Sequence, residues 1–247
     1  MMQSALQSNI GNQRDDNQDR LACVTAENGL QLAVLADGVG GRHGGERAAE
    51  IAVAILSTAF KLATISTSAA AKEWLIHQTT VANDAIVRDG QSENLFGMGS
   101  TVVAVIIFPT QLVIGHVGDS RAYAFDAGEL TQLTEDHTLV NELIKQGQLN
   151  PKQARKVPYQ NVITRALGLG ERLQLEVNQV ERTPTLELLI CSDGLYKEAT
   201  TKQMQRILQL KRADGEQKVT RLIELALKHG GSDNISVMLM QPTKAVK

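Results

Sequence analysis

Cysteine and long apolar runs are scarce in this chain, and both shortages exclude classes of protein. Cys23 and Cys191 are the only cysteines among 247 residues, so we expect free thiols in a reducing compartment rather than a disulfide framework. No uncharged apolar run is long enough to span a bilayer. Residues 1–9 lack the basic-then-apolar pattern of a signal peptide. The expected location is therefore the cytoplasm, with no membrane partner.

Positive charge and aromatic side chains are also in short supply. The 25 Lys and Arg residues are outnumbered by 27 Asp and Glu residues, which gives a net charge of −2 and no basic face for nucleic acid. Aromatic residues make up 3% of the chain and hydrophobic residues 43%, so Leu, Ile, Val and Ala must fill the core. Layered β-rich folds reach this length as one unit, and we expect a single domain.

The apolar pattern predicts strands grouped with strands and helices grouped in pairs. Strands are expected at residues 21–25, 30–36, 100–108, 111–117, 121–126, 129–133, 173–180, 186–191 and 235–240. Helices are expected at residues 46–62, 69–87, 136–146, 201–210 and 215–229. Short turns at Pro109-Thr110 and Ala127-Gly128 favour antiparallel neighbours. This grouping indicates α+β layering rather than alternating βαβ units.

Four short acidic motifs, most of them next to an apolar strand-like run, carry the chemistry of this chain. They are Asn17-Gln18-Asp19, Asp37-Gly38-Val39-Gly40-Gly41, Ser192-Asp193-Gly194 and Gly230-Gly231-Ser232-Asp233-Asn234. Each motif taken alone is also what an ordinary turn contains. Several carboxylates that converge repel one another and lose hydration, so a cation must compensate them. Asp and backbone carbonyl oxygens are ligands that suit Mg²⁺ or Mn²⁺.

In this order, the motifs resemble those of the metal-dependent protein phosphatase family, the type 2C serine/threonine phosphatases. The matching segments are Arg14-Asp15-Asp16-Asn17-Gln18-Asp19, Asp37-Gly38-Val39-Gly40-Gly41, Gly97-Met98-Gly99-Ser100-Thr101, Gly118-Asp119-Ser120-Arg121, Leu133-Thr134-Glu135-Asp136-His137-Thr138, residues 161–168, Ser192-Asp193-Gly194 and residues 231–237. The resemblance implies a four-layer α-β-β-α sandwich, in which antiparallel helix pairs flank two antiparallel β-sheets. It also implies one catalytic domain over residues 1–247, with a flap at residues 147–160.

The resemblance further assigns metal-binding roles to particular residues. Asp37 would bridge two Mn²⁺ or Mg²⁺ ions, Asp193 and Asp233 would complete one site, and the Gly38 carbonyl would contribute to the other. Asp19 would hold the waters around the ions. Asp119, together with Asp193, would bind a third and weaker ion; a turn aspartate is the alternative. Relatives that carry a further acid have it where Lys197 stands here, so a third ion would be held loosely.

Arg14 and Asp37 are the expected catalytic residues. Two ions about 4 Å apart can activate a shared water for attack on phosphorus. Arg14 matches the phosphate-binding arginine of the family, whose planar fork pairs two oxygens at once.

The sequence departs from the family pattern at two places near these residues. Val39 stands where some relatives have a histidine proposed as the general acid, so water must protonate the leaving group. His43 is close in sequence and could substitute, although an exposed position in the glycine-rich turn is the alternative. Val157 precedes Pro158 where relatives usually have histidine, which leaves flap contacts with substrate open. His137 is expected to shape a turn.

The expected function is hydrolysis of phosphoserine and phosphothreonine in proteins, by a monomer that opposes a cognate serine/threonine kinase. Two alternatives stay open: a non-catalytic regulator that binds phosphoproteins, and a broad-specificity phosphoesterase for small esters. The glycine-rich run at residues 38–45 lacks the Gly-Lys-Ser/Thr ending of a nucleotide-binding loop, which excludes that class.

Overall fold

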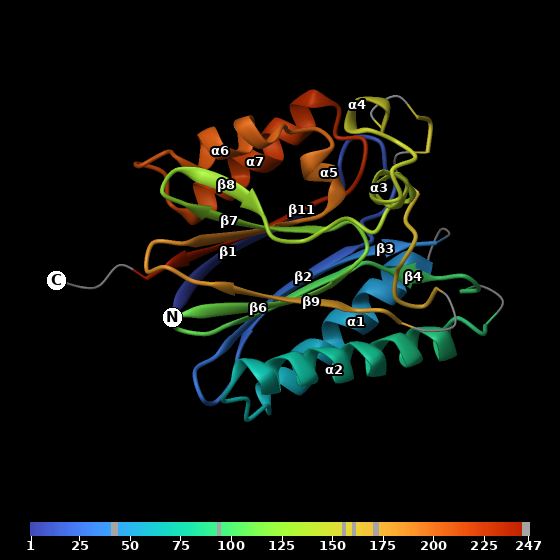
Figure 1. Ribbon diagram of the computed structural model, residues 1–247, viewed down its shortest axis with the longest axis horizontal. Helices are drawn as coiled ribbons and strands as arrows, with labels where there is room; N and C mark the ends of the chain where they lie inside the picture. The colour runs from blue at the N-terminus through green and yellow to red at the C-terminus, as the bar shows by residue number, and fades with distance from the viewer. Residues whose placement is uncertain (41–43, 93–94, 155–156, 160–161, 170–172, 244–247) are drawn as a thin grey trace.

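Two antiparallel β-sheets stack face to face and form the centre of the molecule (Figure 1). The computed structural model describes residues 1–40, 44–92, 95–154, 157–159, 162–169 and 173–243. The first sheet has the strand order β1 (Met2–Asn9), β11 (Ile235–Pro242), β10 (Glu187–Cys191), β7 (Arg121–Asp126) and β8 (Glu129–Gln132). The second has the order β2 (Asp19–Thr25), β3 (Gln31–Val39), β5 (Val102–Ile107), β6 (Gln111–Val117) and β9 (Glu176–Glu181), and the short strand β4 (Gly99–Ser100) pairs with β3.

A helix pair covers the outer face of each sheet (Figure 1). Helices α1 (Gly44–Lys61) and α2 (Ser68–Asp89) lie on the second sheet, and α6 (Thr201–Leu208) and α7 (Gly215–His229) lie on the first. Three short helices, α3 (Leu139–Lys145), α4 (Pro151–Ala154) and α5 (Asp193–Tyr196), gather towards one end of the sandwich. The expected α+β four-layer sandwich is confirmed. Within the described residues, no helix has both the length and the apolar character of a membrane span.

The apolar side chains of the inner strands alternate between two cores, which explains their continuous apolar runs. In β5, Val103 and Val105 face the other sheet, whereas Ala104 and Ile106 pack under the helices. In β10, Leu188 lies between the sheets while Leu189 packs under α6 and α7. A strand covered on both faces has no need of polar alternation.

Several sequence expectations were wrong in detail. The strand β1 was not predicted, because its sequence Met-Gln-Ser-Ala-Leu-Gln-Ser-Asn is mostly polar. It lies at the edge of its sheet, where among the described strands it pairs with β11 alone. The helix expected at residues 136–146 begins at Leu139, where the Thr138 side chain accepts the capping hydrogen bond. The strand expected at residues 100–108 is interrupted at Thr101. The strand expected at residues 30–36 continues to Val39, so Asp37 lies within a strand rather than after it.

Replacement of Leu188 by Ala tests the layer between the sheets. Leu188 is 0% exposed, so the cavity left behind should lower the free energy of unfolding by about 2–5 kcal/mol. Urea denaturation measures this change. Leu62→Ala is the control, because Leu62 is 78% exposed and should change stability by less than about 0.5 kcal/mol. Equal effects of the two substitutions would contradict the packing described here.

Candidate metal centre

A cavity of about 930 Å³ opens at the end of the sandwich where β3, α5 and the turn before β11 meet. Residues from five separate segments line it, including Arg14, Asp37, Gly38, Asp193, Lys197 and Asp233. Five of these were predicted as site residues from the sequence. Asp19 and Asp119, the other two, are buried behind the cavity wall. The fold therefore brings together acids that are almost 200 positions apart in the chain.

Asp37 is held in place by its neighbours in the second sheet. Its N–H donates to Thr101 Oγ1 at 3.1 Å, and its carbonyl accepts from Thr101 N–H at 2.8 Å and from Ser100 Oγ at 3.0 Å. Asp19 is the residue directly opposite Asp37 in the β2–β3 pair. Opposed residues in an antiparallel pair project from the same face of the sheet. The pairing register therefore sets the two carboxylates side by side.

Gly38 must be glycine because the start of α1 packs directly against it. A Cβ atom at Gly38 would lie 2.2 Å from the backbone C and O atoms of Gly45, far inside van der Waals contact. The Gly38 N–H donates to the Gln18 carbonyl at 3.2 Å, which joins this strand to the segment before β2. Because Gly38 has no side chain, its backbone can lie close to that of Gly45. Gly38 lines the cavity beside Asp37.

Asp193 and Asp233 meet because α5 packs on the turn that precedes β11. A Cβ at Gly194 would lie 2.1 Å from the Asn234 carbonyl oxygen, so glycine is required for this contact. The Asn234 side chain accepts from Gln18 N–H at 2.9 Å and donates to the carbonyls of Ile10 and Asp16 at 2.9 and 2.8 Å. This asparagine ties the N-terminal segment to the Asp233 turn. Asn234 belongs to one of the acidic motifs, and its hydrogen bonds were not predicted from the sequence.

Ser192 connects the two sheets at the acid cluster. Its hydroxyl donates to Asp19 Oδ2 at 2.7 Å and accepts from the Ser236 N–H at 2.9 Å. Ser192 and Ser236 belong to the first sheet's side of the sandwich, whereas Asp19 begins β2 of the second. This contact was not predicted, although serine does precede Asp193 in the quoted motif.

Burial and neighbouring charges raise the pKa values of Asp37 and Asp19. Burial, followed by the charges of Asp19, Asp193, Asp119 and Asp233, raises the pKa of Asp37 well above its usual range. Burial raises the pKa of Asp19 to about 7, although hydrogen bonds from serine side chains oppose the shift. Such shifts mark carboxylates that cannot all ionise without a compensating cation.

Two observations show that nearby cations only partly meet this demand. Asp19 Oδ1 and Asp119 Oδ1 are buried and have no hydrogen-bond partner among the described residues. Arg14 Nη2 contacts Asp233 Oδ2 at 2.7 Å, and Lys197 Nζ pairs with Asp193 Oδ2. Buried or partly buried carboxylate oxygens of this kind suit Mg²⁺ or Mn²⁺. The residues present therefore fit a divalent metal centre.

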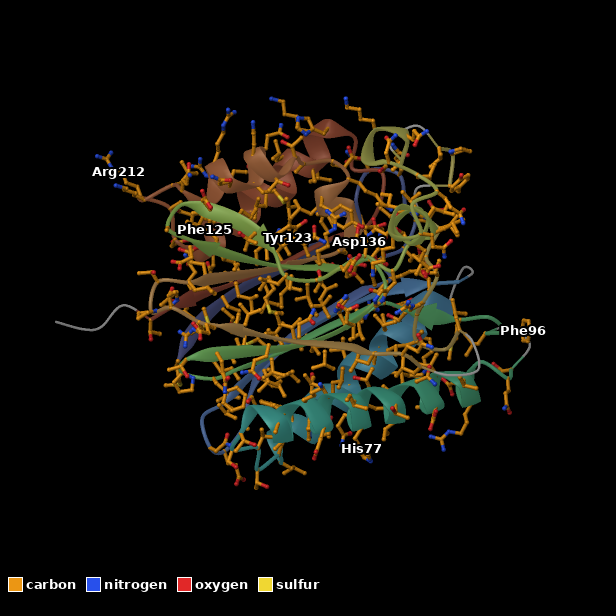
Figure 2. The ribbon with its side chains drawn as sticks, viewed as in Figure 1. His77, Phe96, Tyr123, Phe125, Asp136 and Arg212 are labelled. Carbon is orange, nitrogen blue, oxygen red and sulfur yellow. The ribbon has the colours of Figure 1, made fainter. Side chains whose placement is uncertain are left out.

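Asp119 is connected to Arg121 and Asp136 through the side chain of Tyr196. Tyr196 Oη donates to Asp119 Oδ2 at 3.1 Å, and the Arg121 guanidinium stacks 3.4 Å from the centroid of the Tyr196 ring. Arg121 in turn forms two hydrogen bonds to Asp136, of 2.8 and 2.5 Å, and Asp136 lies where the chain leaves β8 towards α3 (Figure 2). Burial, then the charge of Asp193, raises the pKa of Asp119 to about 6.

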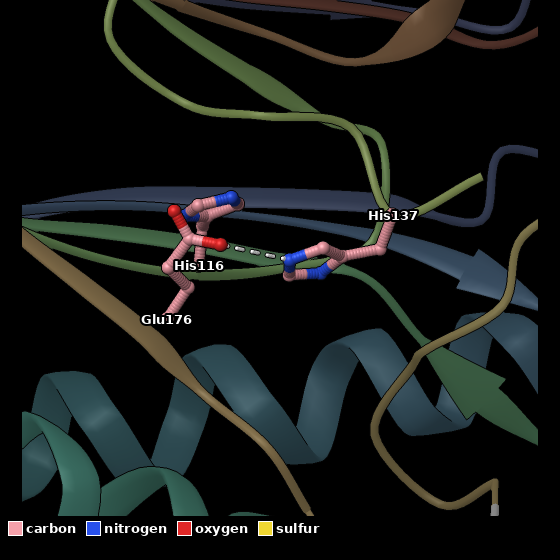
Figure 3. Close-up of side chains that lie close together, drawn as sticks. All are labelled: His116, His137 and Glu176. Atoms are coloured by element: carbon pink, nitrogen blue, oxygen red, sulfur yellow. Dashed lines mark hydrogen bonds and ion pairs between the residues drawn. The ribbon is translucent and has the colours of Figure 1, made fainter. Parts of the chain in front are cut away.

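His116, His137 and Glu176 form a second group with potential ligand atoms, which lie within 4.8 Å of one another (Figure 3). His116 faces Glu176 across the β6–β9 pair, and the two imidazoles stack with centroids 4.9 Å apart. His137 Nδ1 accepts from the Gly118 N–H at 3.1 Å, so the ring proton is on Nε2, which lies 3.3 Å from Glu176 Oε2. A metal on Nε2 would displace that proton and break this arrangement. The group instead fixes the turn before Asp119, as expected for His137.

The remaining sequence expectations have mixed outcomes. Val39 lines the cavity and brings no proton donor to it, and His43 lies outside the described residues. The segment 147–160, described at residues 147–154 and 157–159, contains α4, a helix that was not expected. Ile163, just beyond it, lines the cavity. His77 is exposed on α2 and points away from the sheets (Figure 2).

Neither cysteine has the environment of a nucleophile. Both thiols are free. Cys191 is fully buried in β10, and burial raises its pKa to about 12. The thiolate is the reactive form of cysteine, so a buried thiol with a raised pKa is inert near neutral pH.

A four-layer sandwich with a carboxylate cluster at one end defines a class of metal-dependent phosphatases, and comparisons with known proteins agree. The family model described as Protein phosphatase 2C matches residues 8–237. The chain belongs to this family.

Relatives and solved structures match over almost the full chain. The serine/threonine phosphatase stp of Listeria welshimeri is 37% identical over 97% of this chain and 96% of its own length. The serine/threonine phosphatase structure of S. agalactiae superposes with a TM-score of 0.94 at 33% identity, covering 98% of this chain and 99% of that one. The catalytic domain of PstP in complex with two manganese ions has a TM-score of 0.84 at 32% identity, with 97% of each chain covered.

Stabilisation by Mn²⁺ should depend on pH. The folded-state pKa of Asp19, about 7, lies above the unfolded value near 3.8, so its contribution to stability is present below about pH 4 and is lost as pH rises through about 7. Ion binding requires ionised carboxylates. Mn²⁺ should therefore raise the Tm of chelator-treated protein more at pH 8 than at pH 5.5, as differential scanning fluorimetry measures. K⁺ at equal ionic strength is the control, and an Mn²⁺ effect independent of pH would contradict the buried-acid assignment.

Proposed function

We propose that this protein is a metal-dependent serine/threonine protein phosphatase that hydrolyses phosphoserine and phosphothreonine in proteins. The observation that carries the proposal is the meeting of Asp37, Asp193, Asp233 and Arg14 on one cavity wall. Three carboxylates can hold divalent ions there, and one exposed guanidinium can hold an anion. A phosphate monoester suits such a site, because its negative charge can pair with the guanidinium and its phosphorus can react with a metal-activated water.

The acids and Gly38 hold the metal ions in this proposal. Asp37 would help to hold both ions, the Gly38 carbonyl would serve one of them, and Asp193 and Asp233 would serve the other. The ions, when bound, supply an activated water nucleophile and stabilise charge on the phosphoryl oxygens. Asp19, fixed by the Ser192 hydroxyl at 2.7 Å, orients water on the buried side of Asp37.

Arg14 binds the substrate phosphate. Its side chain is 52% exposed and reaches Asp233 from the rim of the cavity. With an ion held at Asp233, this carboxylate would attract the guanidinium less strongly, and Arg14 would be available to pair two phosphate oxygens. Val39, on the same wall, cannot protonate the leaving alcohol, so solvent performs that step.

The finer assignments are part of the same proposal. Residues 1–247 act as one catalytic domain, with residues 147–160 as a flap. Mn²⁺ or Mg²⁺ serves as the ion, and the PstP relative contains two manganese ions. We further propose a monomer in the cytoplasm that acts on phosphoproteins and opposes a serine/threonine kinase, consistent with the relatives named serine/threonine phosphatases.

Loss of a metal carboxylate should abolish activity. Asp233→Asn removes one anionic ligand and should reduce kcat/KM on a phosphothreonine peptide by at least about 100-fold, with the same loss when wild type is chelated. Release of phosphate with Mn²⁺, with Mg²⁺ and with EDTA measures this. Asp84→Asn is the control, since Asp84 is exposed on α2. Activity that resists both chelation and Asp233→Asn would overturn the proposal.

Arg14→Ala should separate substrate binding from metal binding. Loss of a charge-assisted contact worth about 1.5–3 kcal/mol corresponds to a reduction in kcat/KM of about 10- to 150-fold. Mn²⁺ binding, measured by equilibrium dialysis, should be retained. Arg221→Ala on the exposed face of α7 is the matched control. Loss of bound Mn²⁺ in Arg14→Ala would show that the arginine acts on the metal centre instead.

The alternative functions predict different results with the same reagents. A phosphoprotein-binding regulator would bind the phosphothreonine peptide without releasing phosphate. A broad-specificity phosphoesterase would hydrolyse p-nitrophenyl phosphate as efficiently as the peptide. The proposed phosphatase releases phosphate from the peptide and prefers it.

A further inference from the structure

Lys197 occupies an unusual place for a lysine, inside an acid cluster on the wall of the cavity. Its ammonium pairs with Asp193 Oδ2, and its side chain is 28% exposed. The same cavity contains Arg14 on its rim, paired with Asp233. The Arg14 side chain, at 52% exposed, is more open to solvent than that of Lys197.

The position of Lys197 is set by the backbone of α5. Asp193 is the first residue of this helix and Lys197 caps its end, with the Lys197 N–H donating to the Asp193 carbonyl at 3.0 Å. Residues four apart on one helical turn lie on the same face. Lys197 uses Oδ2 of Asp193, which leaves Oδ1 of that carboxylate for another cation. The ammonium and an ion can therefore share Asp193.

Asp119 needs a cation, and the nearby arginine cannot provide it. Asp119 is 1% exposed, and its Oδ1 has no partner among the described residues. Tyr196 serves Oδ2 of the same carboxylate. Arg121 is engaged in two hydrogen bonds to Asp136 and stacks on Tyr196. The charge of Lys197, the next residue after Tyr196, acts on Asp119 without a hydrogen bond to Oδ1.

We propose that Lys197 is a built-in cation that stands in place of a third divalent ion between Asp193 and Asp119, and so limits the centre to two ions. The inference rests on the proposed metal centre. Two divalent ions and one ammonium carry as much positive charge as the carboxylates of Asp19, Asp37, Asp119, Asp193 and Asp233 carry negative charge. A third divalent ion would then have to displace a tethered ammonium from its only close carboxylate partner among the described residues.

This balance separates the tasks of the two basic side chains. Lys197 compensates the enzyme's own acids, whatever the substrate. Arg14 is left as the surplus cation that meets the phosphate. A chain with a neutral residue at position 197 would leave Asp193 and Asp119 undercompensated and open to a further ion.

Mn²⁺ stoichiometry tests the proposal without reference to activity. Chelator-stripped wild type, Lys197→Gln, Lys197→Arg and Lys202→Gln are titrated with Mn²⁺ at pH 7.5, and bound ion is counted by equilibrium dialysis. Wild type should bind two ions per chain and Lys197→Gln three. Lys197→Arg, which keeps the cation, and Lys202→Gln, which changes an exposed lysine on α6, should each bind two.

Two outcomes would overturn the inference. Three ions in saturated wild type would show that Lys197 does not exclude the third, and this measurement needs no variant to fold. Binding of only two ions by Lys197→Gln, with its folding confirmed by circular dichroism, would show that the ammonium does not limit the number of bound ions. Failure of the metal centre itself looks different, because wild type would then bind no Mn²⁺ and release no phosphate.

Discussion

Mutual repulsion among buried carboxylates is the constraint on which the rest of this structure depends. Asp19 and Asp37 are opposed in one strand pair, and Asp193 and Asp233 approach them from the other sheet. Burial raises the pKa values of Asp19 and Asp37, and the same burial favours binding of divalent ions by these carboxylates. Desolvation that destabilises a lone carboxylate becomes useful when an ion is available, because an ion pair in a low-dielectric site is stronger than one in water.

The fold tolerates this repulsion because rigid contacts around the cluster oppose it. The apolar layer between the sheets fixes the ends of β3 and β10 relative to each other. Ser192 and Asn234 then connect segments of the two halves through hydrogen bonds of 2.7 to 2.9 Å. Gly38 and Gly194 allow backbone contacts that a Cβ would block. Together these contacts hold the carboxylates close to one another, although the charges would separate in an unfolded chain.

Much of the site could be predicted because its chemistry is local in sequence. Asp-Gly and Asp-Asn pairs beside apolar runs singled out Asp37, Asp193 and Asp233, and these three acids line one cavity. The layered fold followed from the grouping of strands and helices, and the family from the order of the motifs. The strand β1 could not be predicted, since its polar sequence acquires strand structure only by pairing with β11, more than 220 residues later.

The sequence by itself determined which acids and glycines stand beside the strand-like runs, and that Val39 rather than a histidine follows Asp37-Gly38. Those properties belong to single residues and short runs. Only the tertiary structure decided which carboxylate oxygens are served by protein cations and which are left without a partner, as Asp193 Oδ2 and Asp119 Oδ1 show. Charge compensation depends on distances between residues far apart in the chain. Those distances are set by how the two sheets stack, and no local pattern encodes them.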